Sequence, residues 1–191
     1  MVIVIKPSNL RVIVVGYGIQ GKKRHKLLPR CEAIVDPVAE EAQYKAVESV
    51  PLDAYDAALV CVPDQEKYAV VKHLLSNKKH VLVEKPILFD EPQAKEIKQL
   101  SNSAVCYTAY NHRFEPHFVR MRDLLKSEEL GKIYTCRMFY GNGTARDVRN
   151  SPWRDKGLGV LQDLGSHLLD TTHFWFGDLQ RNIFKSCGWY I

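Results

Sequence analysis

The stretch that decides the fold is Arg11-Val12-Ile13-Val14-Val15-Gly16-Tyr17-Gly18-Ile19-Gln20-Gly21. Val12 to Val15 is a continuous apolar run, which is typical of a strand buried on both faces of a sheet. The glycines after it have the spacing G-x-G-x-x-G, and the stretch from Gln20 to Leu28 has a helical pattern. In such a strand–turn–helix the glycines allow a tight turn, a close approach of phosphate to the backbone, and close helix–strand packing. The sequence therefore predicts a phosphate-binding turn formed by residues 16–21.

The first half of the chain alternates short apolar runs with helical stretches. This pattern predicts parallel strands joined by right-handed crossovers, and so a doubly wound α/β sheet. The expected further strands are 33–36, 57–62, 80–83 and 104–108, and the expected further helices are 40–47, 67–76 and 91–100, with Asp90 as a cap.

The pattern changes near Asn111. A helix over 116–125, a strand over 133–140 and a helix over 159–176 are expected beyond it. We therefore predict a dinucleotide-binding domain over residues 1–110 and the start of a second, catalytic domain over residues 111–191.

An acidic residue follows the second strand at the distance that a dinucleotide site requires. Asp36 lies 20 residues after Gly16 and ends the run Ala33-Ile34-Val35. A carboxylate there accepts hydrogen bonds from the adenosine ribose and repels a 2′-phosphate, which favours NAD(H) over NADP(H). The alternative is that the glycines only form a tight turn and that Asp36 only caps the next element.

Glu84-Lys85-Pro86 stands at the carboxyl end of the expected strand 80–83. Ligands of open α/β sheets bind at that edge, and Pro86 restricts the residue before it to extended geometry. Lys85 could orient a substrate hydroxyl there. The alternative is an exposed ion pair at the end of the strand.

At this point the chain resembles the Gfo/Idh/MocA oxidoreductases (glucose–fructose oxidoreductase, inositol dehydrogenase and relatives). The resemblance is carried, in order, by residues 16–21, Val62-Pro63-Asp64, Glu84-Lys85-Pro86, Tyr110-Asn111-His112-Arg113-Phe114, and Asp163-Leu164-Gly165-Ser166-His167-Leu168-Leu169-Asp170. It implies a Rossmann domain, then a domain built on a largely antiparallel sheet. It also implies NAD(P)-linked oxidation or reduction at a carbinol of a sugar, nucleotide sugar or cyclitol. Val62, Pro63, Glu84 and Lys85 are then expected beside the cofactor.

The resemblance also implies that Lys85, Asp163 and His167 are catalytic. Asp163 and His167 are four residues apart on an expected helix and so share a face with each other, and Asp170 lies on the same side. A histidine is the natural base for a sugar hydroxyl, and a neighbouring carboxylate can orient it. The alternative is a structural i,i+4 pair.

The chain departs from the family in two respects. Asp64 and Lys67 stand where the family often has Asn and His, so a negative charge is expected near the cofactor. The second domain also stops early, which suggests a truncated or fragmentary chain, or one that dimerises or pairs with another chain. A cofactor-binding module without turnover, or a nucleotide-responsive regulatory protein, is the alternative function.

Composition indicates an ordinary globular protein, with 27 basic and 22 acidic residues. The five cysteines lack disulfide or zinc spacing, and no metal is expected. The basic cluster over residues 22–26 is interpreted as a solvated helix face or an attractor for an anionic cofactor, and no nucleic-acid partner is expected. No long apolar run or signal peptide is found, so a cytoplasmic protein without a membrane partner is expected, with a small sugar-like substrate and a possible homo-oligomer.

Four arginines near the second domain, Arg113, Arg146, Arg149 and Arg154, are candidates for binding an anionic substrate or for plain surface charge. His112, His117 and His173 are expected to be structural or surface residues.

Overall fold

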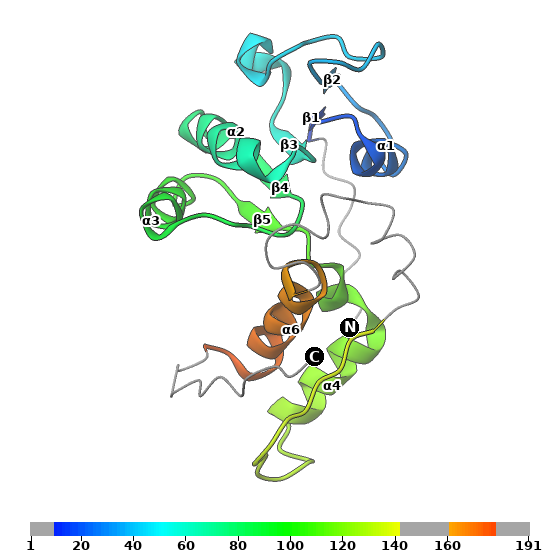
Figure 1. The fold of residues 1–191 in the computed structure, drawn as a ribbon, viewed down its shortest axis with the longest axis vertical. Helices are drawn as coiled ribbons and strands as arrows, with labels where there is room; N and C mark the ends of the chain where they lie inside the picture. The colour runs from blue at the N-terminus through cyan, green and yellow to red at the C-terminus, as the bar shows by residue number, and fades with distance from the viewer. Residues whose placement is uncertain (1–9, 142–160, 179–191) are drawn as a thin grey trace, which may run out of the picture. The chain divides into compact units, whose positions relative to one another are not determined.

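The computed structural model describes residues 10–141 and 161–178 (Figure 1). It divides into two compact units, Met1–Ala109 and Tyr110–Ile191. Arg146, Arg149 and Arg154 lie outside the described residues.

The first unit is built on an all-parallel sheet, which confirms the predicted fold class. The described residues form five strands in the order β2-β1-β3-β4-β5. The strands are β1 (Val12–Val15), β2 (Ala33–Val35), β3 (Ala57–Val60), β4 (His80–Val83) and β5 (Cys106–Thr108). The direction of strand addition reverses between β1 and β3, and this switch point is where open α/β sheets bind their ligands.

Helices cover both faces of this sheet. They are α1 (Ile19–His25), α2 (Asp64–Ser76) and α3 (Glu91–Leu100). Figure 1 shows α2 and α3 together on one face and α1 on the other. The apolar strand residues are sealed between these layers, and Ile13, Val14 and Val60 are fully buried.

The expected start of α3 is confirmed in detail. The Asp90 carboxylate accepts from the backbone N–H of Gln93, and the Gln93 side chain accepts from the backbone N–H of Asp90. This reciprocal pair satisfies two donors that a helix end leaves open, so α3 begins at a defined residue.

The predicted helix over residues 40–47 is wrong. The chain there folds back along the end of β2, where Tyr44 bridges Val35 in parallel. The backbone N–H groups of Gln43 and Tyr44 donate to the carbonyl of Ile34, and Asp36 donates to that of Tyr44. These bonds to β2 replace the helical ones, and two short 3₁₀ turns, Val47–Ser49 and Leu52–Ala54, follow.

The second unit is helical in its described residues. It contains a 3₁₀ turn η3 (Asn111–Phe114), the helix α4 (Pro116–Lys126), and a π-helical turn η4 (Leu161–Gly165) that continues into α6 (Ser166–Phe176). The expected helix over 159–176 is therefore present from Leu161 onward, but its first turn is wider than an α-turn.

The predicted strand over residues 133–140 is wrong for the described structure. None of these residues is assigned to a strand or to a bridge with another described residue. A strand exists only through hydrogen bonds to a neighbour, so an alternating sequence alone does not make one. The segment is instead exposed, with Tyr134 at 83% and Phe139 at 93%.

Candidate functional site

The glycine turn has a geometry that only glycine permits at two of its three positions. Gly16 has φ +88°, and a Cβ on it would lie 2.7 Å from the carbonyl carbon of Cys61. A Cβ on Gly21 would collide with the carbonyl oxygen of Gly16. Gly18 differs, because a Cβ there would meet nothing within 4 Å. The turn is therefore packed from behind at Gly16 and Gly21 and open at Gly18.

The start of α1 is suited to a phosphate group. Gly18 is its N-cap, no side chain caps it, and its first turn contains no acidic residue. The free N–H groups and the positive end of the helix dipole thus remain available to an anion. Ile19 and Gln20 are exposed beside it, and the hydroxyl of half-buried Tyr17 lies 2.6 Å from Nδ1 of His25. These features fit the pyrophosphate of a dinucleotide.

Asp36 supports the glycine turn directly. Its Oδ2 accepts from the backbone N–H of Tyr17 at 2.7 Å, and its Oδ1 accepts from those of Val38 and Ala39 at 2.9 and 2.8 Å. Burial alone would raise the pKa of this carboxyl, but the three N–H donors outweigh it and lower the pKa. The carboxylate therefore stays ionised and keeps acceptor capacity on Oδ2.

Each unit contains a cavity. The cavity in the second unit has a volume of about 660 Å³, and the cavity in the first unit has a volume of about 520 Å³ and adjoins Gly16 and Asp36. Val62 and Pro63, which follow β3, line it as well, so it occupies the switch point of the sheet. Its size and its largely apolar wall suit the adenosine part of a dinucleotide.

Lys45 and Glu48 also line this cavity, and sequence reasoning missed both. Their position follows from the segment that folds back on β2, where the sequence had predicted a helix. No local spacing signals this, because the contacts that fix the segment are with β2.

The Glu84-Lys85-Pro86 turn leaves β4 and is tied to two helices. The Arg24 guanidinium of α1 pairs with the Glu84 carboxylate at 2.6 Å, and Lys67 of α2 donates to the Pro86 carbonyl at 2.8 Å. The interpretation of residues 22–26 as a solvated face is therefore wrong for Arg24, whose side chain is 28% exposed. The Glu84 side chain is only 13% exposed, so the alternative of an exposed ion pair at the end of the strand does not hold.

Asp64 does not present an unbalanced charge. Its Oδ1 lies 2.7 Å from Nζ of Lys67, so the two residues at which the chain departs from the family pair with each other. The negative charge that Asp64 is expected to bring near the cofactor is therefore balanced by the ammonium of Lys67.

In the second unit, His167 lies at the start of α6 and is only 7% exposed. Its ring packs against those of Tyr110, His112 and Tyr140, with centroids 5.7, 4.7 and 5.8 Å away. Asp163 lies one turn earlier, half-buried in the π-helical turn, and its carbonyl accepts from the Ser166 hydroxyl. Asp163 and His167 thus belong to the second unit, and Lys85 belongs to the first.

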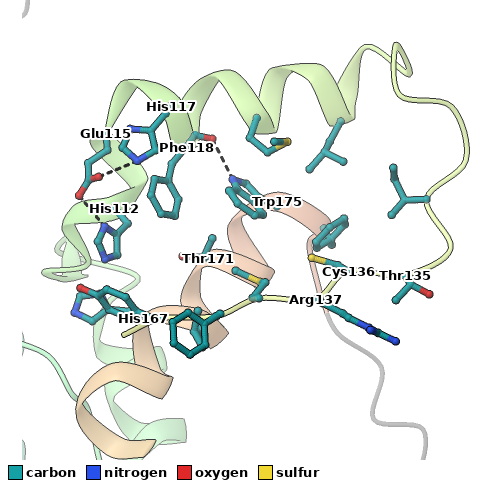
Figure 2. A pocket seen from close by; sticks show the side chains of 18 of the residues that line it. His112, Glu115, His117, Phe118, Thr135, Cys136, Arg137, His167, Thr171 and Trp175 are labelled. Carbon is teal, nitrogen blue, oxygen red and sulfur yellow. Dashed lines mark hydrogen bonds and ion pairs between the residues drawn. The ribbon is translucent and has the colours of Figure 1, made fainter. Parts of the chain in front are cut away.

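His167 also borders the 660 Å³ cavity of this unit, which lies among α4, α6 and the segment over 130–140 (Figure 2). On the α4 side, Glu115 contacts Nδ1 of His112 at 2.7 Å and Nε2 of His117 at 3.3 Å. These two histidines are therefore held by one carboxylate, in agreement with the structural role expected for them.

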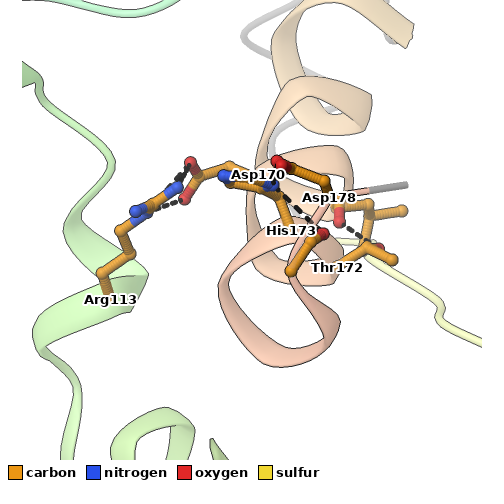
Figure 3. A network of polar contacts seen from close by, with 7 residues as sticks. Arg113, Asp170, Thr172, His173 and Asp178 are labelled. Atoms are coloured by element: carbon orange, nitrogen blue, oxygen red, sulfur yellow. Dashed lines mark hydrogen bonds and ion pairs between the residues drawn. The ribbon is translucent and has the colours of Figure 1, made fainter. Parts of the chain in front are cut away.

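Arg113 and Asp170 form a forked ion pair between η3 and α6 (Figure 3). The shortest contact, from Nη2 to Oδ1, is 2.6 Å, and the Asp170 side chain is 8% exposed. Asp170 is thus committed to Arg113, and Arg113 has an intramolecular carboxylate where an anionic substrate was one of the expectations.

Across residues 10–141 and 161–178, no group of three or more His, Cys, Asp or Glu side chains could hold a metal ion. Helices in this part of the chain are all too short or too polar to cross a membrane. The described cysteines, Cys31, Cys61, Cys106 and Cys136, are free thiols.

Two family models match the chain. Residues 10–112 match the oxidoreductase family with an NAD-binding Rossmann fold, and residues 118–184 match the GFO/IDH/MocA C-terminal domain. The chain belongs to the Gfo/Idh/MocA oxidoreductase family.

Individual relatives agree with this assignment. The oxidoreductase YdgJ of Escherichia coli is 29% identical over 190 residues, covering 89% of this chain and 54% of the relative. The scyllo-inositol 2-dehydrogenase (NADP(+)) IolW of Bacillus subtilis is 25% identical, covering 90% and 53%. The structure of myo-inositol 2-dehydrogenase from Lactobacillus plantarum shares the fold with a TM-score of 0.70 at 16% identity, covering 88% and 56%. The chain thus spans about half the length of the curated relatives it matches.

Proposed function

We propose that the protein transfers a hydride between a nicotinamide dinucleotide and a carbinol of a sugar, nucleotide sugar or cyclitol. The observation that carries this proposal is the cradle at the switch point, where an open Gly18, an uncapped α1 and the Asp36 cavity adjoin one another. Membership of an oxidoreductase family with inositol dehydrogenases among the relatives supports the substrate class.

Each proposed catalytic residue supplies one physical function. The bound nicotinamide would supply the hydride chemistry. His167 takes or returns the proton of the substrate hydroxyl, Asp163 orients the substrate or the histidine, and Lys85 holds the substrate oxygen and favours its alkoxide form.

We further propose that NAD(H) is preferred over NADP(H). Asp36 is ionised and borders the cavity, so a 2′-phosphate on the adenosine ribose would meet a negative charge. The Lys45 side chain borders the same cavity and lessens this repulsion, so the preference is expected to be moderate.

The test of binding is a titration of the chain with NADH and with NADPH, followed by the fluorescence of the reduced nicotinamide. Saturable binding that favours NADH supports the proposal, and Asp36→Ala is expected to remove most of that preference. A folded sample that binds neither cofactor contradicts it.

The test of catalysis is His167→Ala, assayed with a panel of sugars and cyclitols. Turnover is expected to fall about 10²–10⁴-fold, the usual contribution of a general base, while the Kd for NADH stays unchanged. Thr172→Ala on the same helix serves as the control, because its hydroxyl bonds to the helix carbonyl of Leu168. Unchanged turnover in His167→Ala removes His167 from the mechanism.

A second candidate is a module that binds the cofactor without turnover. The burial of His167 among three rings favours it, because a general base must reach its substrate. Saturable NADH binding without oxidation of any polyol in the panel would identify this function.

A further inference from the structure

Lys67 is a buried ammonium that bonds to two different segments of the chain. It lies in the first turns of α2 and is 2% exposed. Its Nζ donates to Oδ1 of Asp64 at 2.7 Å and to the carbonyl oxygen of Pro86, 19 residues along the chain, at 2.8 Å. One charge therefore joins the start of α2 to the turn that follows β4.

Burial makes these partners necessary. An ammonium taken out of water is strongly destabilising unless it is paired and hydrogen-bonded. A movement of Pro86 away from α2 would leave Lys67 buried with one acceptor fewer. Movement of the Pro86 carbonyl is therefore resisted by the free energy needed to leave the buried Lys67 ammonium without this hydrogen bond.

The residue on the other side of Lys85 is held in a similar way. The Glu84 carboxylate accepts from Nε of Arg24 at 2.6 Å. The backbone N–H of Glu84 donates to the carbonyl of Val60 at 2.9 Å. Arg24 comes from α1, the helix that begins at the glycine turn. Guanidinium–carboxylate bonds of this length are among the stronger hydrogen bonds in proteins.

We propose that Arg24 and Lys67 are positioning residues that fix Lys85 from both sides, one through Glu84 and the other through Pro86. The proposal deepens the proposed function and rests on it for the role of Lys85 toward the substrate. It assigns a positioning role to two cations for which the sequence motifs indicate none. It also links the helix of the phosphate cradle to the turn that carries Lys85.

The same helix provides a matched control. Lys72 of α2 also forms an ion pair, with Glu96 at 2.7 Å, but the two side chains are 46% and 38% exposed. Exposed pairs contribute little, and this one joins α2 to α3, away from the Glu84-Lys85-Pro86 turn. Lys72→Met thus removes a lysine and an ion pair from α2 without touching the proposed support.

The direct experiment measures Lys85 itself in the full chain. Brief acylation with acetic anhydride, quantified for each lysine by peptide mass spectrometry, gives the reactivity of its amine. Lys67→Met and Arg24→Met are each expected to change the acylation rate of Lys85 severalfold, because each removes a charge-assisted hydrogen bond that holds a residue next to Lys85 and so alters the surroundings of its amine. Lys72→Met is expected to leave it unchanged. Equal Lys85 rates in wild type, Lys67→Met and Arg24→Met overturn the proposal.

Two milder variants cover the case in which a methionine variant does not fold. Lys67→Gln keeps a shorter donor and Arg24→Lys keeps the charge without the fork, so each is expected to change the Lys85 rate by less than its methionine counterpart does. Wild-type rates in both of these folded variants would also overturn the proposal.

Kinetics separate this proposal from the proposed function. In Lys67→Met, kcat with a polyol substrate is expected to fall about tenfold or more while the Kd for NADH changes less than about twofold, because Lys85 is displaced and the glycine cradle is intact. A wild-type chain without polyol turnover contradicts the proposed function alone. Lys85 acylation then decides whether Arg24 and Lys67 position the turn.

Discussion

At the scale of single residues, different glycines of the turn serve packing and binding. Gly16 and Gly21 are needed because backbone atoms occupy the space that a Cβ would take, whereas Gly18 faces open space. Gly18 has φ −72° and ψ −160°, which alanine adopts without strain. The absence of a side chain at Gly18 therefore leaves room for a ligand and is not required by the fold.

This difference predicts opposite outcomes for two alanine variants. Gly21→Ala is expected to destabilise the chain by about 1–3 kcal/mol, since a neighbouring backbone must move. Gly18→Ala is expected to keep or slightly raise stability, by about 0.4–1 kcal/mol, but to weaken NADH binding about tenfold or more. Urea unfolding and an NADH titration check both. Undiminished binding in Gly18→Ala would place the phosphate elsewhere.

A second residue-scale prediction concerns Asp56. Hydrogen bonds from the Arg11 side chain and backbone hold the pKa of its carboxyl well below the usual range. Because the folded pKa is depressed, the stabilisation is complete above the unfolded pKa of about 3.9 and is lost as the pH falls through the folded pKa. Asp56→Asn is therefore expected to be less stable than wild type at pH 7, with a smaller difference at pH 3. Urea unfolding at the two pH values measures this. A difference that grows toward acid would contradict it.

At the scale of elements, polar contacts join helices and turns that lie far apart along the sequence. Arg113 and Asp170 attach η3 to α6, and the Trp175 indole N–H donates to the carbonyl of Phe118 between α6 and α4 at 3.0 Å. Two of the rings around His167, those of Tyr110 and His112, come from η3 and the residue before it, and the third belongs to Tyr140. The position of His167 thus depends on how α6 is held.

We predict that Asp170→Asn weakens the second unit by about 1.5–3 kcal/mol, as expected when a charged hydrogen-bond acceptor is removed. Asp178→Asn is the control, because Asp178 is fully exposed and its contact with His173 is 3.6 Å (Figure 3). All three tryptophans fall within residues 110–191, so urea unfolding followed by tryptophan fluorescence reports on this unit. Equal stabilities of the two variants would show that the forked pair contributes nothing.

At the scale of the whole molecule, the two units differ in how completely they bury apolar surface. Both units expose some large apolar side chains, but the buried apolar residues of the described structure, from Ile13 to Ala104, all lie in the first unit. Burial of apolar area is the main stabilising contribution to a fold, so the second unit is expected to open first.

Limited proteolysis with chymotrypsin tests this order. Early cuts are expected after Tyr134 and Phe139, because an exposed segment without strand pairing enters a protease readily. A fragment that retains residues 10–109 is expected to persist. First cuts within the β1–β5 sheet would reverse the expected order.

Local sequence determined the part of this protein whose contacts are close along the chain. The apolar run before Gly16, the glycine spacing, the cap at Asp90 and the alternation of strands and helices each express a backbone preference over a few residues, so the parallel sheet followed from them. Tertiary structure alone decided the fold-back of Tyr44 on β2, the unpaired segment 133–140, and the ties of Arg24 and Lys67 to the turn around Lys85. The partners of Arg24 and Lys67 lie 60 and 19 residues away along the chain, and Tyr44 meets β2 across a loop. Whether a buried charge is stable, and whether an extended segment forms a strand, depends on the group that folding places beside it.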